Sequence, residues 1–195
     1  TKLEDDLQKL NAGDWKYQVA GAYLGWVGSP CGPGNRPIPS GFFNGIVSPI
    51  IPFAIHGALW YQGEANVERA WQYRTIFPAL IRDWRSQWGQ GEFPFLYVQL
   101  TNTNYRPAKG TEPGESCVAE LRDAQLAALS VPNTGMAVAA DIGDATTWHA
   151  TNKQDVGDRL ARWALAKVYG KNRPYSGPLY ESMAVEGKII RVRFK

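Results

Sequence analysis

The chain has 195 residues, enough for one domain with a substantial core, and its 44% apolar and 20% charged residues are ordinary for a globular protein. Its 21 basic and 18 acidic side chains are spread along the chain, so the net charge of +3 makes no case for nucleic acid or a membrane surface. No apolar run reaches the roughly 18 residues of a transmembrane helix, no signal-peptide pattern opens the chain, and two cysteines are too few for a disulfide framework.

The first 41 residues contain two recognisable patterns. Residues 1–12 place Leu3, Leu7 and Leu10 on one helical face, which predicts a short amphipathic helix. Residues 28–41 are dense in glycine and proline, which predicts an irregular loop.

Three apolar runs predict buried strands, over residues 53–61, 93–100 and 135–140. The first run is nearly continuous in apolar character, which is typical of a parallel strand covered on both faces. Because helical patterns separate the runs, the order strand, helix, strand, helix, strand, helix predicts an α/β fold with a parallel sheet.

Three helices follow from the spacing of apolar residues and from capping signals. The first, about residues 70–88, contains Pro78, where we expect a kink or a new helix start. The second, about 117–130, has Ser116 as its cap, and in the third Thr151 and Gln154 have the spacing of a capping box. The tail from Lys188 to Lys195 alternates weakly, with no partner strand recognised nearby.

Two polar loops follow predicted strands, at residues 60–66 and 141–149. The carboxyl ends of strands in an open α/β sheet are where such sheets bind ligands. His149 in the second loop is a candidate general base that takes a proton from a serine hydroxyl and returns it to a leaving alcohol. The alternative is a loop histidine that only hydrogen-bonds the helix start. The other histidine, His56, falls within a predicted strand and is interpreted as structural.

The first loop offers donors to a developing oxyanion from Gln62, Gly63 and Asn66. The alternative for Asn66 is an N-cap of the following helix. Glu64 is interpreted as a buried acceptor that holds the loop in shape. Two distant histidines without paired cysteines have no metal-ligand spacing, so neither a metal nor a cofactor is predicted.

The sequence has no recognisable serine nucleophile. None of its serines lies in a G-x-S-x-G elbow, and none begins a helix after a buried strand. Cys117 is a conceivable thiol nucleophile, although a lone helical cysteine is far more often a small core residue.

Several segments, in one collinear order from about residue 35 onward, resemble the sialate O-acetylesterase family of SGNH (GDSL-type) hydrolases. The segments are Pro39-Ser40-Gly41-Phe42-Phe43-Asn44-Gly45, residues 57–66, residues 77–85, Trp88-Gly89-Gln90-Gly91, Ala119-Glu120-Leu121-Arg122-Asp123-Ala124-Gln125, Asp141-Ile142-Gly143-Asp144, residues 152–157 and Tyr175-Ser176-Gly177-Pro178.

The resemblance implies a flavodoxin-like, three-layer SGNH fold that removes acetyl groups from sugar hydroxyls. It also implies a serine nucleophile in a G-Q-S-N block, which this chain lacks. Residues 1–180 then correspond to the second half of the catalytic domain, incomplete at the N-terminal side, and residues 181–195 to the start of a C-terminal β-domain or a tail strand. Carried over, His149 is the general base and Gln62 lies in the oxyanion loop, near Asn66.

The residues around His149 depart from the family pattern. The usual aspartate before the histidine is replaced by Thr146 and Thr147, and the usual proline after it by Ala150. Asp144 is the nearest acid and the candidate to orient the ring. The serine common after the loop glutamate is Ala65.

The first functional hypothesis is therefore a carboxylic ester hydrolase acting on O-acetylated sugars, with its serine supplied by a companion segment or another chain. The expected protein partner is such a segment or chain, or a second copy of this chain in a homo-oligomer. The resemblance implies an extracytoplasmic location, whether periplasmic, secreted or lysosomal. The alternative hypothesis is a non-catalytic sugar-binding or structural fragment of the same fold.

Overall fold

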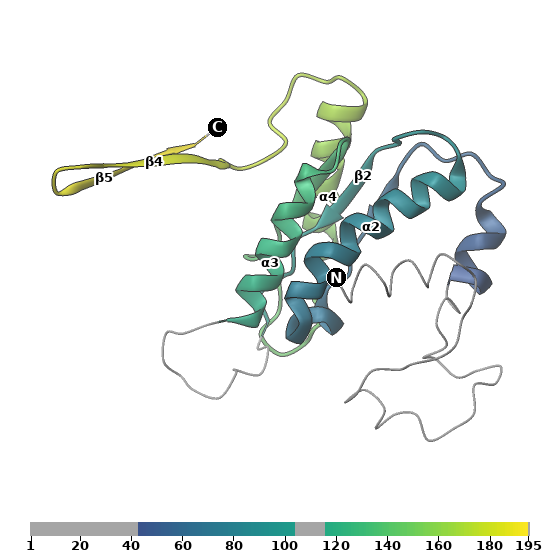
Figure 1. Cartoon of the computed structure of the whole chain (residues 1–195), viewed down its shortest axis with the longest axis horizontal. Helices are drawn as coiled ribbons and strands as arrows, with labels where there is room; N and C mark the ends of the chain where they lie inside the picture. The colour runs from purple at the N-terminus through teal and green to yellow at the C-terminus, as the bar shows by residue number, and fades with distance from the viewer. Residues whose placement is uncertain (1–42, 104–115, 195) are drawn as a thin grey trace, which may run out of the picture. The chain divides into compact units, whose positions relative to one another are not determined.

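The computed structural model describes residues 43–103 and 116–194 (Figure 1). The chain divides into two compact units, Thr1–Ile50 and Ile51–Lys195. In the first unit the described residues form a π-helical turn, η2 (Phe43–Val47), and a 3₁₀ turn, η3 (Ser48–Ile50). The predicted helix over residues 1–12, the predicted loop over 28–41 and Cys31 lie outside the described residues.

The second unit contains a parallel three-stranded sheet. Its strands are β1 (Ala58–Trp60), β2 (Phe95–Val98) and β3 (Thr134–Ala137), in the spatial order β1-β2-β3. Ala58 lies beside Phe95, and Phe95 beside Thr134, with both pairs of strands parallel. The predicted α/β fold with a parallel sheet is confirmed.

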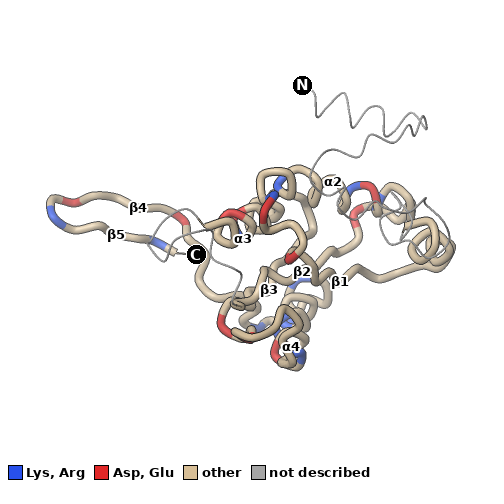
Figure 2. Tube along the Cα trace, turned by 90° about the horizontal axis from the view of Figure 1, so that it is seen from below, with Lys and Arg blue, Asp and Glu red and all other residues tan. Residues whose placement is uncertain are grey.

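Helices cover the sheet from both sides, which makes three layers (Figures 1 and 2). Helices α2 (Ala70–Trp88) and α3 (Cys117–Ala127) pack against each other on one face. Helix α4 (Lys153–Trp163) covers the other face over β2 and β3, and a π-helical turn, η6 (Ala164–Val168), extends it.

The alternation of side chains along β2 supplies both halves of the core. Tyr97 points toward α2, where its ring lies 4.9 Å from that of Phe77. Leu96 and Val98 point the other way and pack with Trp163 of α4. Because all four residues of β2 are buried, the prediction of a strand covered on both faces is confirmed for β2.

The same prediction is wrong for β1. Leu59 is 66% exposed, whereas Trp60 packs against Trp84 of α2 with ring centroids 5.7 Å apart. The reason is geometric, since α4 lies over β2 and β3 and, in the part of the chain that the structure describes, no helix covers that face of β1.

The helix boundaries agree with the sequence in most details. Helix α2 runs through Pro78 without a new start and ends at Gly89, whose φ of 63° is the left-handed conformation that glycine adopts readily. The Ser116 hydroxyl accepts from Ala119 N, as predicted for the cap of α3. The N-cap of α4 is Asn152 and not Thr151, because the Asn152 side chain accepts from the amide of Asp155.

Two sequence interpretations are corrected near the ends of the second unit. His56 lies in a bend before β1, exposed and stacked on Tyr169, and not within a strand. The tail does have a partner strand, because β4 (Tyr180–Glu186) and β5 (Ile189–Phe194) form an antiparallel hairpin. Gly187, with φ of 63°, takes the first central position of its two-residue turn.

None of the helices in the described ranges combines the length and the apolar character that crossing a bilayer requires.

Candidate active site

The loops that follow the three strands are joined to one another at the carboxyl edge of the sheet. Asn102, after β2, accepts from the amide of Gly143, after β3, over 2.7 Å. The Thr103 hydroxyl donates to the carbonyl oxygen of Thr147 over 3.1 Å. The loop after β1 is joined to the end of β2 through a side chain of α3, described below. The two polar loops singled out from the sequence therefore flank one common edge.

The carbonyl oxygen of Gln62 is held from two helices. The Tyr73 hydroxyl of α2 donates to it over 3.2 Å, and Nε2 of Gln125, on α3, approaches it at 3.4 Å. The side chain of Gln62 donates to Oδ1 of Asn66 over 2.7 Å. Two of the predicted oxyanion residues, Gln62 and Asn66, are thus in direct contact.

The surroundings of Asn66 and Glu64 differ from the sequence interpretation. Both belong to a 3₁₀ helix, η4 (Glu64–Arg69), and Asn66 lies in its interior, so the alternative of Asn66 as an N-cap is wrong. Glu64 is the first residue of η4 and is half-buried. Its role in holding the loop stays a prediction.

His149 is exposed, so its ring is not sealed in the core. Its amide donates to the Thr147 hydroxyl over 3.1 Å, and among the described residues the imidazole has no hydrogen-bond partner. The general-base role of His149 stays a prediction.

Asp144 is bonded to a neighbour other than His149. Its Oδ1 accepts from the amide of Thr146 over 2.7 Å and from the Thr146 hydroxyl over 2.6 Å. These hydrogen bonds favour the charged carboxylate and lower the pKa of Asp144. The use of Asp144 to orient the His149 ring stays a prediction, and it requires the loop or the ring to move.

The start of the His149 loop is clamped to α4. Arg159 forms two contacts with the Asp141 carboxylate, of 2.6 and 2.8 Å, and a third with the carbonyl oxygen of Val138. The hydrogen bond from Arg159 lowers the pKa of Asp141 to about 2. Asp141 therefore stays ionised at neutral pH and fixes the loop where it leaves β3.

Gln125 is a site residue that the sequence interpretation missed. It is fully buried, its Oε1 accepts from the amide of Leu100 over 2.9 Å, and its Nε2 lies 3.3 Å from the carbonyl oxygen of Val98. The signal was available, because Gln125 falls on the inward apolar stripe that runs from Leu121 of α3 to Ala128 just beyond its end, where a polar residue is unusual. Such a residue needs a specific set of partners.

The other candidate groups are placed as follows. Cys117 is a half-buried free cysteine at the first position of α3. In the ranges that the structure describes, no three histidine, cysteine, aspartate or glutamate side chains gather as metal ligands do.

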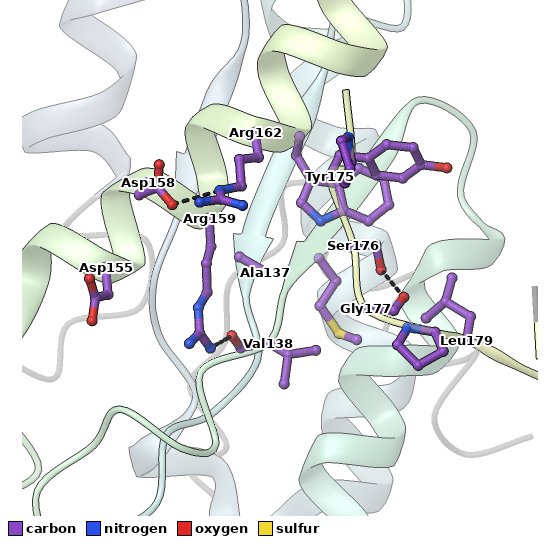
Figure 3. Close-up of a pocket in the computed structure, with 14 residues that line it drawn as sticks. Ala137, Val138, Asp155, Asp158, Arg159, Arg162, Tyr175, Ser176, Gly177 and Leu179 are labelled. Atoms are coloured by element: carbon purple, nitrogen blue, oxygen red, sulfur yellow. Dashed lines mark hydrogen bonds and ion pairs between the residues drawn. The ribbon is translucent and has the colours of Figure 1, made fainter. Parts of the chain in front are cut away.

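A cavity of about 690 Å³ lies away from these loops, between β3, α4 and residues 174–179 (Figure 3). Arg159 and Arg162 line it, but none of the predicted site residues does. The arginines are already paired, Arg162 with Asp158 and Arg159 with Asp141.

Comparison with known proteins gives consistent relatives. A family model described as carbohydrate esterase, sialic acid-specific acetylesterase, matches residues 46–166. Human sialate O-acetylesterase is 33% identical over 171 residues, which cover 80% of this chain and 32% of that protein. The rat sialate O-acetylesterase is 36% identical over 168 residues, covering 77% of this chain and 30% of that protein.

A solved structure, that of a carbohydrate acetylesterase from Xanthomonas citri, is 42% identical to this chain. The two superpose with a TM-score of 0.69 over 75% of this chain and 34% of the other. The chain thus spans about a third of the length of the proteins it matches. With three linked loops at one sheet edge and a family model that covers most of the chain, this protein belongs to the sialic acid-specific acetylesterase family of carbohydrate esterases.

Proposed function

We propose that this chain supplies the acid–base and oxyanion parts of an esterase that removes acetyl groups from sugar hydroxyls. The nucleophilic serine comes from a companion segment or from another chain. In the reaction the serine oxygen attacks the acetyl carbonyl while His149 takes the hydroxyl proton. Donors of the Gln62 loop stabilise the tetrahedral oxyanion. His149 then returns its proton to the sugar oxygen as the bond from that oxygen to the acetyl carbon breaks, so the sugar leaves with a free hydroxyl. Water, activated by His149, next attacks the acetyl-enzyme and releases acetate and the serine.

The observation that carries this proposal is the joining of the loops after β1, β2 and β3. The contacts between Asn102 and Gly143 and between Gln125 and Gln62 tie donor and base loops to the same strand, β2. Relative positions fixed in this way are what acyl transfer needs, because base and oxyanion donors must meet one substrate carbonyl. The His149 side chain is exposed and its imidazole has no hydrogen-bond partner among the described residues, which leaves room for the incoming hydroxyl.

A non-catalytic sugar-binding role is the second candidate. It is favoured by the placement of Asp144, whose oxygen is engaged by Thr146 instead of by His149. A histidine without an acid partner has a less well fixed tautomer and orientation.

The test is hydrolysis of p-nitrophenyl acetate by this chain, alone and co-expressed with a segment that carries G-Q-S-N. We expect turnover only in the combined protein, and inhibition of that turnover by a fluorophosphonate. The variant His149→Ala should lower it by about 10²–10⁴-fold, the usual contribution of a general acid–base.

His56→Ala is the matched control, since His56 is the other histidine of the chain and lies in a bend before β1. Its turnover should equal that of the parent. An inactive combined protein, or one whose turnover survives His149→Ala, would leave the sugar-binding role as the better account. Serine-dependent turnover by this chain alone would contradict the external nucleophile.

The finer assignments of partner and compartment rest on the family resemblance. We infer an acetylated sugar as substrate and an extracytoplasmic location, whether periplasmic, secreted or lysosomal. Fractionation of the source cells, followed by immunoblotting, tests the location.

A further inference from the structure

In the peptide unit between Gln62 and Gly63, the carbonyl group is held by hydrogen bonds, whereas the N–H group has no acceptor among the described residues. Its carbonyl oxygen accepts from the Tyr73 hydroxyl, at 3.2 Å, and faces Nε2 of Gln125, at 3.4 Å. The peptide bonds of the described residues are all trans. In a trans peptide the N–H points away from the C=O, so the amide of Gly63 is directed away from the donors on α2 and α3.

The amide of Gly63 is a donor in need of an acceptor. Gly63 is buried, and its N–H has no hydrogen-bond acceptor among the described residues, although its own carbonyl accepts from Asn66 N over 2.8 Å. Buried backbone donors are almost always satisfied, so an amide at a sheet edge with no acceptor among the described residues points to an acceptor beyond them, which a bound ligand can supply.

We propose that Tyr73 and Gln125 are positioning residues that aim the Gly63 amide at the oxyanion of the reaction. This inference rests on the proposed esterase function and names residues that act through Gly63 without touching the substrate.

The Gln125 side chain is well suited to this task because it takes over where the β1–β2 pairing ends. The carbonyl of Pro94 accepts from Ala58 of β1 over 2.9 Å, and by the two-residue period of a strand the carbonyl of Val98 faces the same side. Beyond Trp60 the chain leaves the sheet, and the Gln125 amide fills the place with bonds to Val98 O and Leu100 N. The Gln125 side chain thus contacts both the end of β2 and the loop that leaves β1, and fixes the position of that loop relative to β2.

Tyr73 holds the same carbonyl from α2 and is 2% exposed. Burial raises the pKa of Tyr73 to about 12, so its hydroxyl keeps its proton, and remains a donor, at any pH where an esterase of this kind works. The Gly63 site itself is close-packed, since an added Cβ would lie 3.2 Å from Gln125 Nε2 and from Leu121 Cδ2.

The test compares Tyr73→Phe with Tyr97→Phe in the full chain. Both substitutions remove one buried tyrosine hydroxyl from the same core, but the Tyr97 hydroxyl donates over 2.7 Å to the backbone carbonyl of Gln125, whereas that of Tyr73 donates to the carbonyl of Gln62. We expect Tyr73→Phe to shift the NMR signals of the Gln62 carbonyl carbon and the Gly63 amide, and to broaden the latter. Tyr97→Phe should leave both signals in place. Gln125→Met is the second variant and should shift them in the same direction as Tyr73→Phe.

The combined, serine-bearing protein supplies the second readout. A misdirected donor weakens transition-state stabilisation and not substrate binding, so Tyr73→Phe should lower kcat and leave KM nearly unchanged. We expect a fall in kcat of about tenfold, which is smaller than the 10²–10³-fold loss typical when an oxyanion donor is removed. Tyr97→Phe should keep the parent kcat. Equal effects of the two substitutions on the Gly63 signals or on kcat would show a merely structural role and overturn the inference.

The two proposals fail separately. If the combined protein never turns over, the esterase function fails, while the NMR signals still report whether Tyr73 and Gln125 aim the amide. If turnover is present and Tyr73→Phe leaves the Gly63 amide unmoved, this inference fails and the esterase function stands.

Discussion

Arg159 and Asp141 form a two-pronged ion pair, with nitrogen–oxygen distances of 2.6 and 2.8 Å, between α4 and the loop that follows β3. The same guanidinium donates to the carbonyl of Val138 (Figure 3). One side chain therefore fixes both the end of β3 and the loop that leads to His149.

This ion pair predicts a pH-dependent contribution to stability. The pKa of Asp141, about 2 in the folded chain, lies below the value near 3.9 of an unfolded aspartate. The contribution is therefore complete above about pH 4 and is lost as the pH falls from there toward 2. Because the Asp141 side chain is 64% exposed, we expect Asp141→Asn to cost less than about 1 kcal/mol at pH 6.

Urea unfolding of the parent and Asp141→Asn at several pH values measures this difference, which should shrink below pH 4. Asp158→Asn is the control, since it removes the single i,i+4 contact of Arg162 and leaves the His149 loop alone. A parent chain no more stable than Asp141→Asn at pH 6 would show that the clamp contributes nothing.

A glycine packed under α4 and an exposed glycine on α4 predict opposite effects of the same substitution. At Gly135 of β3 an added Cβ would lie 2.5 Å from Cε3 of Trp163 and 2.9 Å from Cδ2 of Leu96, so Gly135→Ala should destabilise by about 1–3 kcal/mol. At Gly157 in α4 nothing lies within 4 Å, and Gly157→Ala should stabilise by about 0.5–1 kcal/mol through helix propensity. Thermal unfolding monitored by circular dichroism measures both, and a similar melting temperature for the two variants would contradict the packing of α4 on β3.

Gly143 is the position where the loops after β2 and β3 approach most closely. An added Cβ would overlap the backbone oxygen of Asn102, so Gly143→Ala must push the two loops apart. We expect the NMR signals of the His149 ring to shift, with those of His56 unmoved as an internal control. In the combined protein kcat should fall on the order of 10²-fold, as small misplacements of catalytic groups do. An unchanged His149 signal would mean that the loop contact does not position the ring.

Tyr61 and Tyr97 differ in whether their buried hydroxyls are satisfied. The Tyr97 hydroxyl donates to Gln125 O, whereas that of Tyr61 has no partner in the part of the chain that the structure describes. Tyr97→Phe should therefore cost about 0.5–1.5 kcal/mol, and Tyr61→Phe close to nothing. Chemical denaturation of both variants tests this, and an equal cost would show that the Tyr61 hydroxyl has a partner in solution.

The order and type of elements could be predicted from the sequence because apolar periodicity and capping chemistry are local signals. The buried β2, the cap at Ser116 and the end of α2 at Gly89 all follow from residues within a few positions. The exposure of Leu59 could not be predicted, because it depends on which strands α4 covers. The hairpin was missed because β4 alternates poorly in polarity, and its pairing with β5 depends on the turn at Gly187.

The site was predicted only as far as its loops. Position after a strand was enough to single out Gln62 and His149, since parallel strands bring their carboxyl ends to one edge. The hydrogen-bond partners of the site residues could not be predicted. Asp144 bonds Thr146, only two residues away, and Gln125 bonds residues 25 and 63 positions earlier in the chain. The apolar stripe of α3 marks Gln125 as unusual, but periodicity does not say which residues across the fold it bonds, nor that Asp144 bonds Thr146.

The buried amide of Gln125 has one more consequence for how this edge adapts to a ligand. The loop after β1 cannot swing outward without breaking the part-buried contacts of the Gln62 carbonyl oxygen with Tyr73 and Gln125, whereas the His149 loop is tethered through solvent-accessible contacts such as that between Asn102 and Gly143. On substrate binding we therefore expect the loop after β1 to stay in place and the His149 loop to move.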